Sequence, residues 1–570
     1  MPASSSSSFE QRPSKITKMD DSIDVTDAVT GTAPVPSYRP DAKTRRYDRQ
    51  LRLWASAGQR SLEQARVLLV GCDAAGSQTL KNLVLPGISH FTILASQIVK
   101  AQDVATSFFL HPNSIGLNIA QESVKYLSEL NPAVEGAARC DDPAELLITD
   151  PQFFLNFTLV ILSNVDPDLE LQIANLLWKT SEVASNLDIP LISIRSSGFA
   201  SRMQIQFWEH TIVDSHPDTT HTLRLNQPFS TLEEHARSLN FAVMDTMEHS
   251  HIPWVVLLVR AACIWKDSHD GKLPETSEEK SQFKEQLIAE KAKGDEENYE
   301  EALSQAYRVW NSCDVSWDIK QLLEEDNIKN ISSNSKNLHI LLHTLAQYLI
   351  PAPHLPPTSP SLPDMHSSTV SYVALQNLYK AQFQTDLTRF KALLNENLRK
   401  IGLSEDSIPD DEVQGFVKNV GGVGIVRGTA LKESKENSDG LLSEITTFDE
   451  KMDTATCLSM FLALLAGERF FLEKRRWPGT ASTKELEKDN HEIGKIVKSF
   501  LPQFLGLPDI VSESIAEVNR GGYATIPTTA AFVGGVAAQE AIKLVTNQYI
   551  PLNNTIVFNL VKSESAKFKF

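Results

Sequence analysis

Cysteine is scarce in this chain, with five residues in 570. None of the five stands in a C-x-x-C pair; they are Cys72, Cys140, Cys263, Cys313 and Cys457. Their scatter excludes a zinc site of the usual spacing and provides no disulfide framework. A reducing compartment suits such a chain, so we expect a cytoplasmic and nuclear location.

Long apolar segments and an excess of basic residues are also lacking. The N-terminal region has no apolar signal core, and the most apolar run, 254–265, contains Arg260 and is too short to span a bilayer. Asp and Glu number 72 against 54 Lys and Arg, which gives a formal net charge of -18. Nucleic acids and anionic membranes attract basic surfaces, so we expect neither as a partner.

The order of patterns along the chain predicts four segments. Residues 1–43 carry a serine run and little apolar material, which is typical of a disordered tail. Residues 44–212 alternate short apolar strands with helices, and residues 213–512 are dominated by helical patterns. Residues 513–570 return to the style of the first part. A chain of 570 residues is long enough for several such domains.

The alternation within residues 44–212 predicts an α/β fold. Apolar strands are expected at 67–70, 91–94, 159–162 and 191–194, with helices between them, which indicates a mostly parallel sheet covered on both faces. The segment 202–208 alternates with a period of two and predicts a half-exposed antiparallel strand. An apolar helix from Pro527 and a strand at 553–560 are expected to rejoin this sheet, so the fold is predicted to be discontinuous.

The turn after the first strand has the outline of a nucleotide-binding G-x-G-x-x-G loop. Its outer glycines, Gly71 and Gly76, permit the tight turn and close helix packing, but Asp73 replaces the glycine that a phosphate approaches. The acidic residue that holds the ribose falls at Ala95, which has no carboxylate. The pattern fits either a nucleotide fold without its ligand contacts or an ordinary strand-to-helix turn.

A short helix that presents arginines is expected just before this strand. In YDRQLRLWASAG, the residues Tyr47, Leu51 and Trp54 fall on one helical face, while Arg49 and Arg52, three apart, lie together on another. Without further information, both arginines fit solvated positions or ion pairs at an interface.

Several motifs together resemble one family. They are YDRQLRLW at 47–54, LKNLVLPGI at 80–88, SHPD at 215–218, HSHIPWV at 249–255, LPDM at 362–365, LQNLY at 375–379, RRWPG at 475–479 and GGVAAQEAIK at 534–543. In this order, around a long helical insertion, they resemble the adenylating enzymes that activate ubiquitin-like proteins. Among these, the chain resembles the regulatory, non-catalytic subunits that serve the cullin-modifying, Nedd-type modifier, the amyloid-precursor-protein-binding protein family.

The resemblance implies a discontinuous, Rossmann-like adenylation fold that is pseudo-active. Active members use ATP and magnesium, with an Asn-Arg-Gln segment, a lysine, a ribose acid and a metal-binding aspartate. In this sequence the segment becomes Ala105, Thr106 and Ser107, the lysine becomes Ile119, and Asp166 matches the aspartate. With Asp73 and Ala95 as well, no group remains to neutralise the phosphate charge. We expect this chain alone to bind no cofactor and no metal, and its partner to hold ATP and magnesium.

Arg49 is the residue that the resemblance implies is still active. In this family two adenylation folds pair, and the arginine of the YDRQ-type helix reaches into the other subunit's ATP site. The planar, permanently charged guanidinium suits phosphate oxygens. Arg52 is expected to be structural.

Other candidates favour structural roles. His210, His216 and His221 lack matching acidic or cysteine ligands for a metal. His249 and His251 fit capping or packing before Pro253, and the glycines at 421–424 fit a turn. The glutamates at 296–301 fit solvated helix faces, and no cysteine stands in the context of a thioester nucleophile.

The function expected from the resemblance is a regulatory subunit of a heterodimeric activating enzyme for the Nedd-type modifier. Its partners would be a catalytic subunit, the modifier and, through the complex, a conjugating enzyme. The insertion would form half of the domain that carries the partner's catalytic cysteine. Three alternatives are a self-sufficient adenylating enzyme, a regulatory subunit for a SUMO-type modifier, and a non-catalytic adaptor. The long insertion argues against the SUMO-type subunit.

Overall fold

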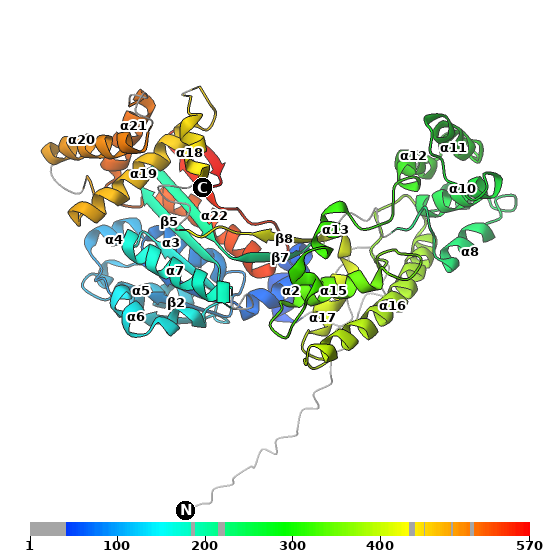
Figure 1. Ribbon diagram of the computed structural model, residues 1–570, viewed down its shortest axis with the longest axis horizontal. Helices are drawn as coiled ribbons and strands as arrows, with labels where there is room; N and C mark the ends of the chain where they lie inside the picture. Colours follow the sequence, from blue (N-terminus) through cyan, green and yellow to red (C-terminus); the bar gives the residue numbers. More distant parts are fainter. Residues whose placement is uncertain are drawn as a thin grey trace, which may run out of the picture.

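The computed structural model describes residues 41–183, 188–214, 223–431, 439–449, 451–479, 483–501 and 507–570. These residues form two bodies, a sheet body and a helical body, arranged along the long axis of the molecule (Figure 1). The predicted disordered tail at 1–43 falls almost entirely outside the described residues and stays a prediction.

The sheet body is built on one eight-stranded sheet in the order β10-β9-β6-β5-β4-β1-β2-β3. Strands β1 to β5 are parallel, whereas β6, β9 and β10 join antiparallel at one side. The strands are β1 (Arg66–Val70), β2 (His90–Leu94), β3 (Glu135–Arg139), β4 (Leu159–Ser163), β5 (Leu191–Ser197), β6 (Ala200–Gln206), β9 (Thr555–Asn559) and β10 (Glu564–Phe568). Because β9 comes from the C-terminal end and pairs with β6, the predicted discontinuous α/β fold is confirmed.

Helices cover both faces of the sheet, as alternating strands and helices require. On one face α2, α3, α5 and α22 bury Val67 and Leu69 of β1, and on the other α6, η2 and α7 bury Leu68 and Val70. The elements are α2 (Ala42–Gln64), α3 (Ala74–Val84), α4 (Ala101–Thr106), η1 (Pro112–Ser114), α5 (Ile119–Ser128), α6 (Pro143–Thr149), η2 (Pro151–Asn156), α7 (Pro167–Val183) and α22 (Pro527–Thr546). The central strand is therefore apolar on both faces, which explains its continuous apolar run.

Four further helices share one core at this side of the sheet: α18 (Asp439–Thr446), α19 (Ala455–Lys474), α20 (Thr483–Phe500) and α21 (Asp509–Gly521). Of these, α19 and α21 contact the strands, and α20 packs on α19 and α21. Their core includes Ala200 of β6 and Val557 of β9. The sequence analysis placed them in the insertion of 213–512, but structurally they belong to the sheet body. Among the residues that the structure describes, α19 alone is long and apolar enough to cross a membrane, and 78% of its most apolar window is buried inside the protein.

Strand β6 differs from its prediction as a half-exposed strand, because every residue of it is buried. Its polar positions Arg202 and Gln206 lie on the face toward α7 and α19 and have partners in the interior. Gln206 donates to the Ala174 carbonyl, and Arg202 pairs with Glu170 and Glu468. The alternation of polar and apolar residues in β6 therefore reflects two buried faces, one polar and one apolar, and not one buried and one exposed face.

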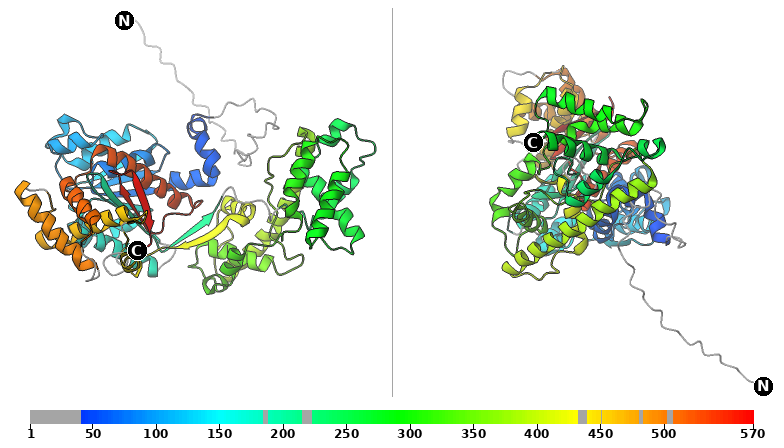
Figure 2. Two further views of the ribbon diagram at one scale, coloured as in Figure 1. Left: turned by 90° about the horizontal axis from the view of Figure 1, so that it is seen from above. Right: turned by 90° about the vertical axis from the view of Figure 1, so that its right-hand side faces the viewer.

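The chain leaves and re-enters the sheet body through a two-stranded ribbon, β7 (Glu209–Val213) with β8 (Val423–Arg427). Figure 2 shows the two strands side by side between the bodies. The helical body lies between these strands in sequence, so its bounds are narrower than the predicted 213–512.

The helical body has two cores joined by α16, a helix of 32 residues. Leu375 and Tyr379 lie in one core, and Phe383 to Leu398 contribute to the other. Its elements are α8 (Ser230–Ser238), α9 (Thr246–Ser250), α10 (Trp254–Ser268), α11 (Ser277–Ala289), α12 (Glu297–Gln305), η4 (Ala306–Val309), α13 (Trp317–Leu323), α14 (Asp326–Lys329), α15 (Asn337–Tyr348), α16 (Thr369–Lys400), α17 (Asp410–Lys418) and η5 (Val420–Gly422).

Candidate functional site

The glycine loop lies between β1 and α3, at the carboxyl end of the parallel strands, where α/β folds bind ligands. Gly71 has a φ of +78°, and a Cβ there would lie 2.5 Å from the Ser163 carbonyl oxygen. A Cβ on Gly76 would already lie 3.0 Å from the Ser163 Cβ. Both outer glycines therefore have the predicted roles, a tight turn and close packing of helix on strand.

The Asp73 side chain fills the space that a phosphate would take. It caps α3 by accepting from the Gly76 amide at 3.0 Å. The same carboxylate accepts from the Ser163 hydroxyl at 2.5 Å, the Asn164 amide at 3.2 Å and the Thr525 hydroxyl at 2.6 Å. The helix N-terminus, which favours an anion, already has one from the chain itself. The cradle does not fit a nucleotide phosphate.

The other positions of the degenerate site are apolar or occupied. Ala95 is fully buried at the end of β2, and its carbonyl accepts from the Asn118 side chain at 3.1 Å. Ile119 begins α5 and packs into the core beneath the loop. Neither side chain is polar; that these positions make no nucleotide contacts stays a prediction.

The three residues that replace the family's Asn-Arg-Gln segment lie at the C-terminal end of α4. Ala105 and Thr106 close this helix, and the Thr106 hydroxyl is bonded to the Gln102 carbonyl. Ser107 is buried and accepts from the Phe109 amide. None of these side chains carries a charge with which to bind a phosphate.

Asp166 is exposed, and its backbone carbonyl accepts from the Glu170 amide in the first turn of α7. Among the described residues, no three His, Cys, Asp or Glu side chains gather as a metal site would require. That this chain holds no metal stays a prediction.

A buried group of four charges lies beside this edge and was missed by the sequence analysis. Arg195 of β5 contacts Glu170 at 2.6 Å and Glu468 at 3.1 Å, and Arg202 of β6 pairs with the same two glutamates. Burial alone would lower the pKa of Arg202, but the charges of Glu468 and Glu170 raise it above its usual value. The group joins β5, β6, α7 and α19. Its only signal in the sequence is charge within strands, which does not identify partners.

Arg49 lies on α2, and its side chain is exposed. No hydrogen bond or ion pair joins its guanidinium to any residue described by the structure. Arg52, by contrast, pairs with Asp48 at 3.1 Å, and Arg46 donates to the Leu130 carbonyl. Arg49 is thus charged and free to contact another molecule, while Arg52 has a structural partner as expected.

The histidine candidates do not form one site. His210 is buried in β7, and burial lowers its pKa to about 4, whereas His216 and His221 lie outside the described residues. His249 is buried and packs as expected, with Nδ1 2.8 Å from Glu296. The prediction that 296–301 is a solvated face is therefore wrong for Glu296, which is 2% exposed.

Four of the five cysteines are unsuited to nucleophilic chemistry, whereas Cys140 is exposed. Cys72, Cys263, Cys313 and Cys457 are buried, and burial raises the pKa of each thiol, that of Cys72 to about 11. Thiolates are the reactive form, so these thiols are inert at neutral pH. The expected packing role is confirmed for Cys263 in α10 and Cys457 in α19.

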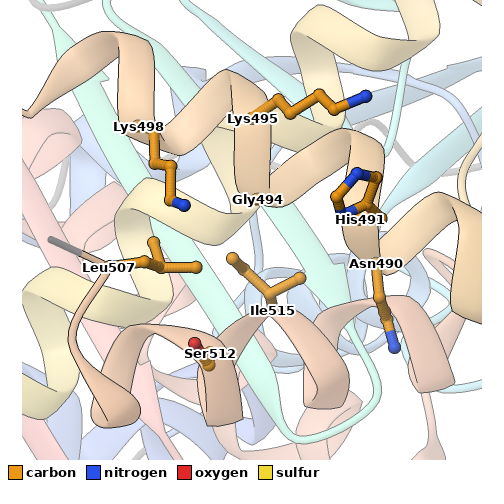
Figure 3. Close-up of a pocket in the computed structure, with 8 residues that line it drawn as sticks. All are labelled: Asn490, His491, Gly494, Lys495, Lys498, Leu507, Ser512 and Ile515. Atoms are coloured by element: carbon orange, nitrogen blue, oxygen red, sulfur yellow. The ribbon is translucent and has the colours of Figure 1, made fainter.

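A cavity of about 270 Å³ lies elsewhere, between α20 and α21 (Figure 3). It is lined by Asn490, His491, Gly494, Lys495, Lys498, Leu507, Ser512 and Ile515. Its two lysines, Lys495 and Lys498, are exposed. Neither the glycine loop nor α2 contributes to it.

Comparison with known proteins shows the family to which the chain is similar. The model of the ThiF family matches residues 47–570. The NEDD8-activating enzyme E1 regulatory subunit of Drosophila melanogaster is 36% identical over 94% of this chain and 100% of its own length. The Xenopus laevis protein of the same name is 34% identical over 92% of this chain and 98% of its own. The subunit named AXR1 of Arabidopsis thaliana is 32% identical over 92% and 96%.

Proposed function

The chain belongs to the ThiF family and, within it, to the NEDD8-activating enzyme E1 regulatory subunits, and we propose that it completes its catalytic partner's ATP site with Arg49. As a regulatory subunit it acts in the activation of NEDD8 together with a catalytic subunit. The alternatives of a self-sufficient adenylating enzyme, a subunit for a SUMO-type modifier and an unrelated adaptor are not favoured by these relatives.

The single observation that carries the Arg49 role is its free, exposed guanidinium on an otherwise anchored helix. Its neighbours Arg46 and Arg52 are engaged within the chain, at the Leu130 carbonyl and at Asp48. An arginine that is exposed and without a described partner can form bidentate hydrogen bonds to phosphate oxygens on a second subunit. There it would neutralise charge as the modifier's carboxylate attacks the α-phosphate, a form of electrostatic stabilisation.

The proposal assigns ATP and magnesium to the partner and none to this chain. It is supported by the internal carboxylate of Asp73 at the phosphate position and by the apolar residues at Ala95 and Ile119. A second negative charge brought to the Asp73 carboxylate would be repelled and would compete for its four hydrogen-bond donors. In this role the glycine loop serves the packing of the body that meets the catalytic subunit.

The helical body is proposed to form half of the domain around the partner's catalytic cysteine. The burial of Cys72, Cys263, Cys313 and Cys457 supports a nucleophile supplied by the partner. The further proposed contacts are NEDD8 and, through the complex, a conjugating enzyme, with no nucleic acid or membrane, in the cytoplasm and nucleus. The acidic balance, -18 overall, supports the absence of nucleic-acid and membrane partners.

The test is the rate of modifier adenylation by the reconstituted heterodimer. Arg49→Ala should lower ATP-dependent adenylate formation several-fold or more; arginine fingers in γ-phosphoryl transfer contribute about 10³- to 10⁵-fold, which is an upper guide for this different reaction. Arg52→Ala is the matched control, because it removes a neighbouring exposed arginine with an internal partner. Both variants should assemble normally by gel filtration. An unchanged rate with Arg49→Ala would refute the proposal.

A separate titration tests the assignment of the nucleotide. The isolated chain should show no micromolar binding of magnesium-ATP by calorimetry. Micromolar affinity would mean that the degenerate loop still works and would return the self-sufficient enzyme to consideration.

A further inference from the structure

The α2 helix is fixed at one end by Tyr47. The Tyr47 ring is buried, and its hydroxyl accepts from the Asn131 side chain at 3.0 Å. Asn131 is itself fully buried and also donates to the Val84 carbonyl at 2.9 Å. Gly87, with a φ of +90°, leaves the space for the hydroxyl, since a Cβ there would lie 2.4 Å from it. The turn after α3 is therefore a socket for Tyr47.

The helix is fixed a second time at a break between Trp54 and Ala55. Ala55 has a φ of +54°, which interrupts the helical ladder and frees carbonyl groups. The Gln548 amide donates to the Trp54 carbonyl at 2.6 Å, and the Tyr549 hydroxyl donates to the Leu53 carbonyl at 3.1 Å. These two partners follow α22, at the opposite end of the chain.

Arg49 lies between the two fixed points. Residues two apart on an α-helix point about 200° from each other. Burial of Tyr47 in its socket therefore turns Arg49 away from the sheet body, as its exposure shows. The two attachments determine the rotation of the helix about its axis and its position along that axis. The location of the Arg49 guanidinium, at the end of a long side chain, depends on both.

We propose that Tyr47 and Gln548 are positioning residues for Arg49 in the partner's ATP site. The inference rests on the proposed function of Arg49 and extends it to two residues that do not touch the nucleotide. A rigid helix limits the conformations that Arg49 must give up on contacting phosphate, so it lowers the entropic part of the barrier.

Both residues also contribute to packing, so the experiment must separate positioning from stability. The variants are Tyr47→Phe, which removes only the hydroxyl, and Gln548→Leu, which removes only the amide that holds the break. Each is made in the native chain and in the Arg49→Ala chain. Adenylate formation by the full heterodimer is then measured with ATP and with the modifier as the varied substrate.

The expected result is a loss of about two- to tenfold in kcat/KM for ATP with either variant, the scale of one hydrogen bond. The KM for the modifier should stay unchanged. In the Arg49→Ala background the same substitutions should have no further effect, because the residue they position is gone. Tyr379→Phe is the matched control: its buried hydroxyl bonds the Leu223 carbonyl in the helical body, far from α2 in the sequence, and it should be neutral.

Two results would overturn the inference. One is an equal loss in the native and Arg49→Ala backgrounds, which would mean that the residues act only through stability. The other is no loss from either variant while Arg49→Ala itself is impaired. If Arg49→Ala has full activity, the proposed role of Arg49 itself is refuted. That result differs from the two above, so failure of the positioning inference and failure of the proposed function can be told apart. Should Tyr47→Phe fail to assemble, Gln548→Leu carries the test.

Discussion

Replacing Asp73 should convert a closed loop into an anion site. In Asp73→Ala the capping hydrogen bond to the Gly76 amide is lost, together with the acceptor for Ser163, Asn164 and Thr525. An N-cap contributes about 1 kcal/mol. The other hydrogen bonds contribute roughly 0.5–1.5 kcal/mol each, and because one carboxylate serves all of them, we expect a total loss of about 2–4 kcal/mol.

The matched control for this substitution is Asp142→Ala. Asp142 also caps a helix, α6, by accepting from the Ala144 and Glu145 amides, but no side chain from another segment donates to it in the described structure. Its loss should cost only about 1 kcal/mol. The difference between the two variants therefore measures the hydrogen bonds that join the loop to β4 and to the segment before α22.

Inorganic phosphate should restore part of the lost stability in Asp73→Ala only. The variant exposes the amides at the N-terminus of α3 with three further donors, a favourable cradle for an anion. Phosphate at ten times its dissociation constant would stabilise the variant by about 1.4 kcal/mol. The assay is thermal unfolding in phosphate and in chloride at equal ionic strength. Equal phosphate effects on the native chain and both variants would refute the idea that Asp73 occupies an anion cradle.

Two further predictions concern stability. Burial lowers the pKa of His210 to about 4, so the folded state resists its protonation. Stability should be fully present above pH ~6.5 and fall by up to about 3 kcal/mol as the pH drops towards 4, measured by urea unfolding; His210→Phe should remove that part of the slope. Gly71→Ala should destabilise the chain far more than Gly116→Ala, because both glycines have positive φ but only Gly71 faces a backbone carbonyl at 2.5 Å. Equal losses in denaturant would contradict the close-approach argument.

The sequence predicted the parallel core because local patterns determine it. Continuous apolar strands separated by helices have few arrangements other than a sheet covered on both faces. The bounds of the insertion were wrong because a helical pattern does not reveal which core a helix joins. Helices α18 to α21 read like those of the insertion, yet their core includes Ala200 and Val557 from the sheet.

In the candidate site, too, local features could be predicted from the sequence, whereas contacts between distant segments could not. The roles of Gly71 and Gly76 follow from backbone geometry within one turn, so the loop pattern predicted them. The partners of Asp73 come from β4 and from the segment before α22, up to 452 residues away. The pattern therefore identified an unsuitable charge but not its use as a cap. For the same reason the burial of Glu296 beside His249 could not be predicted.

The glycine loop has two structural requirements in the absence of a bound ligand. The amides at the start of α3 still need an acceptor, and the loop still needs a connection to the segment that leads into α22. One carboxylate meets both requirements, since Asp73 bonds Gly76 on one side and Thr525 on the other. The adjoining helix α22 packs against α3 and α2, and the segment after it holds the break in α2 through Gln548. The closed loop thus stabilises the same end of the chain that holds Arg49 in position.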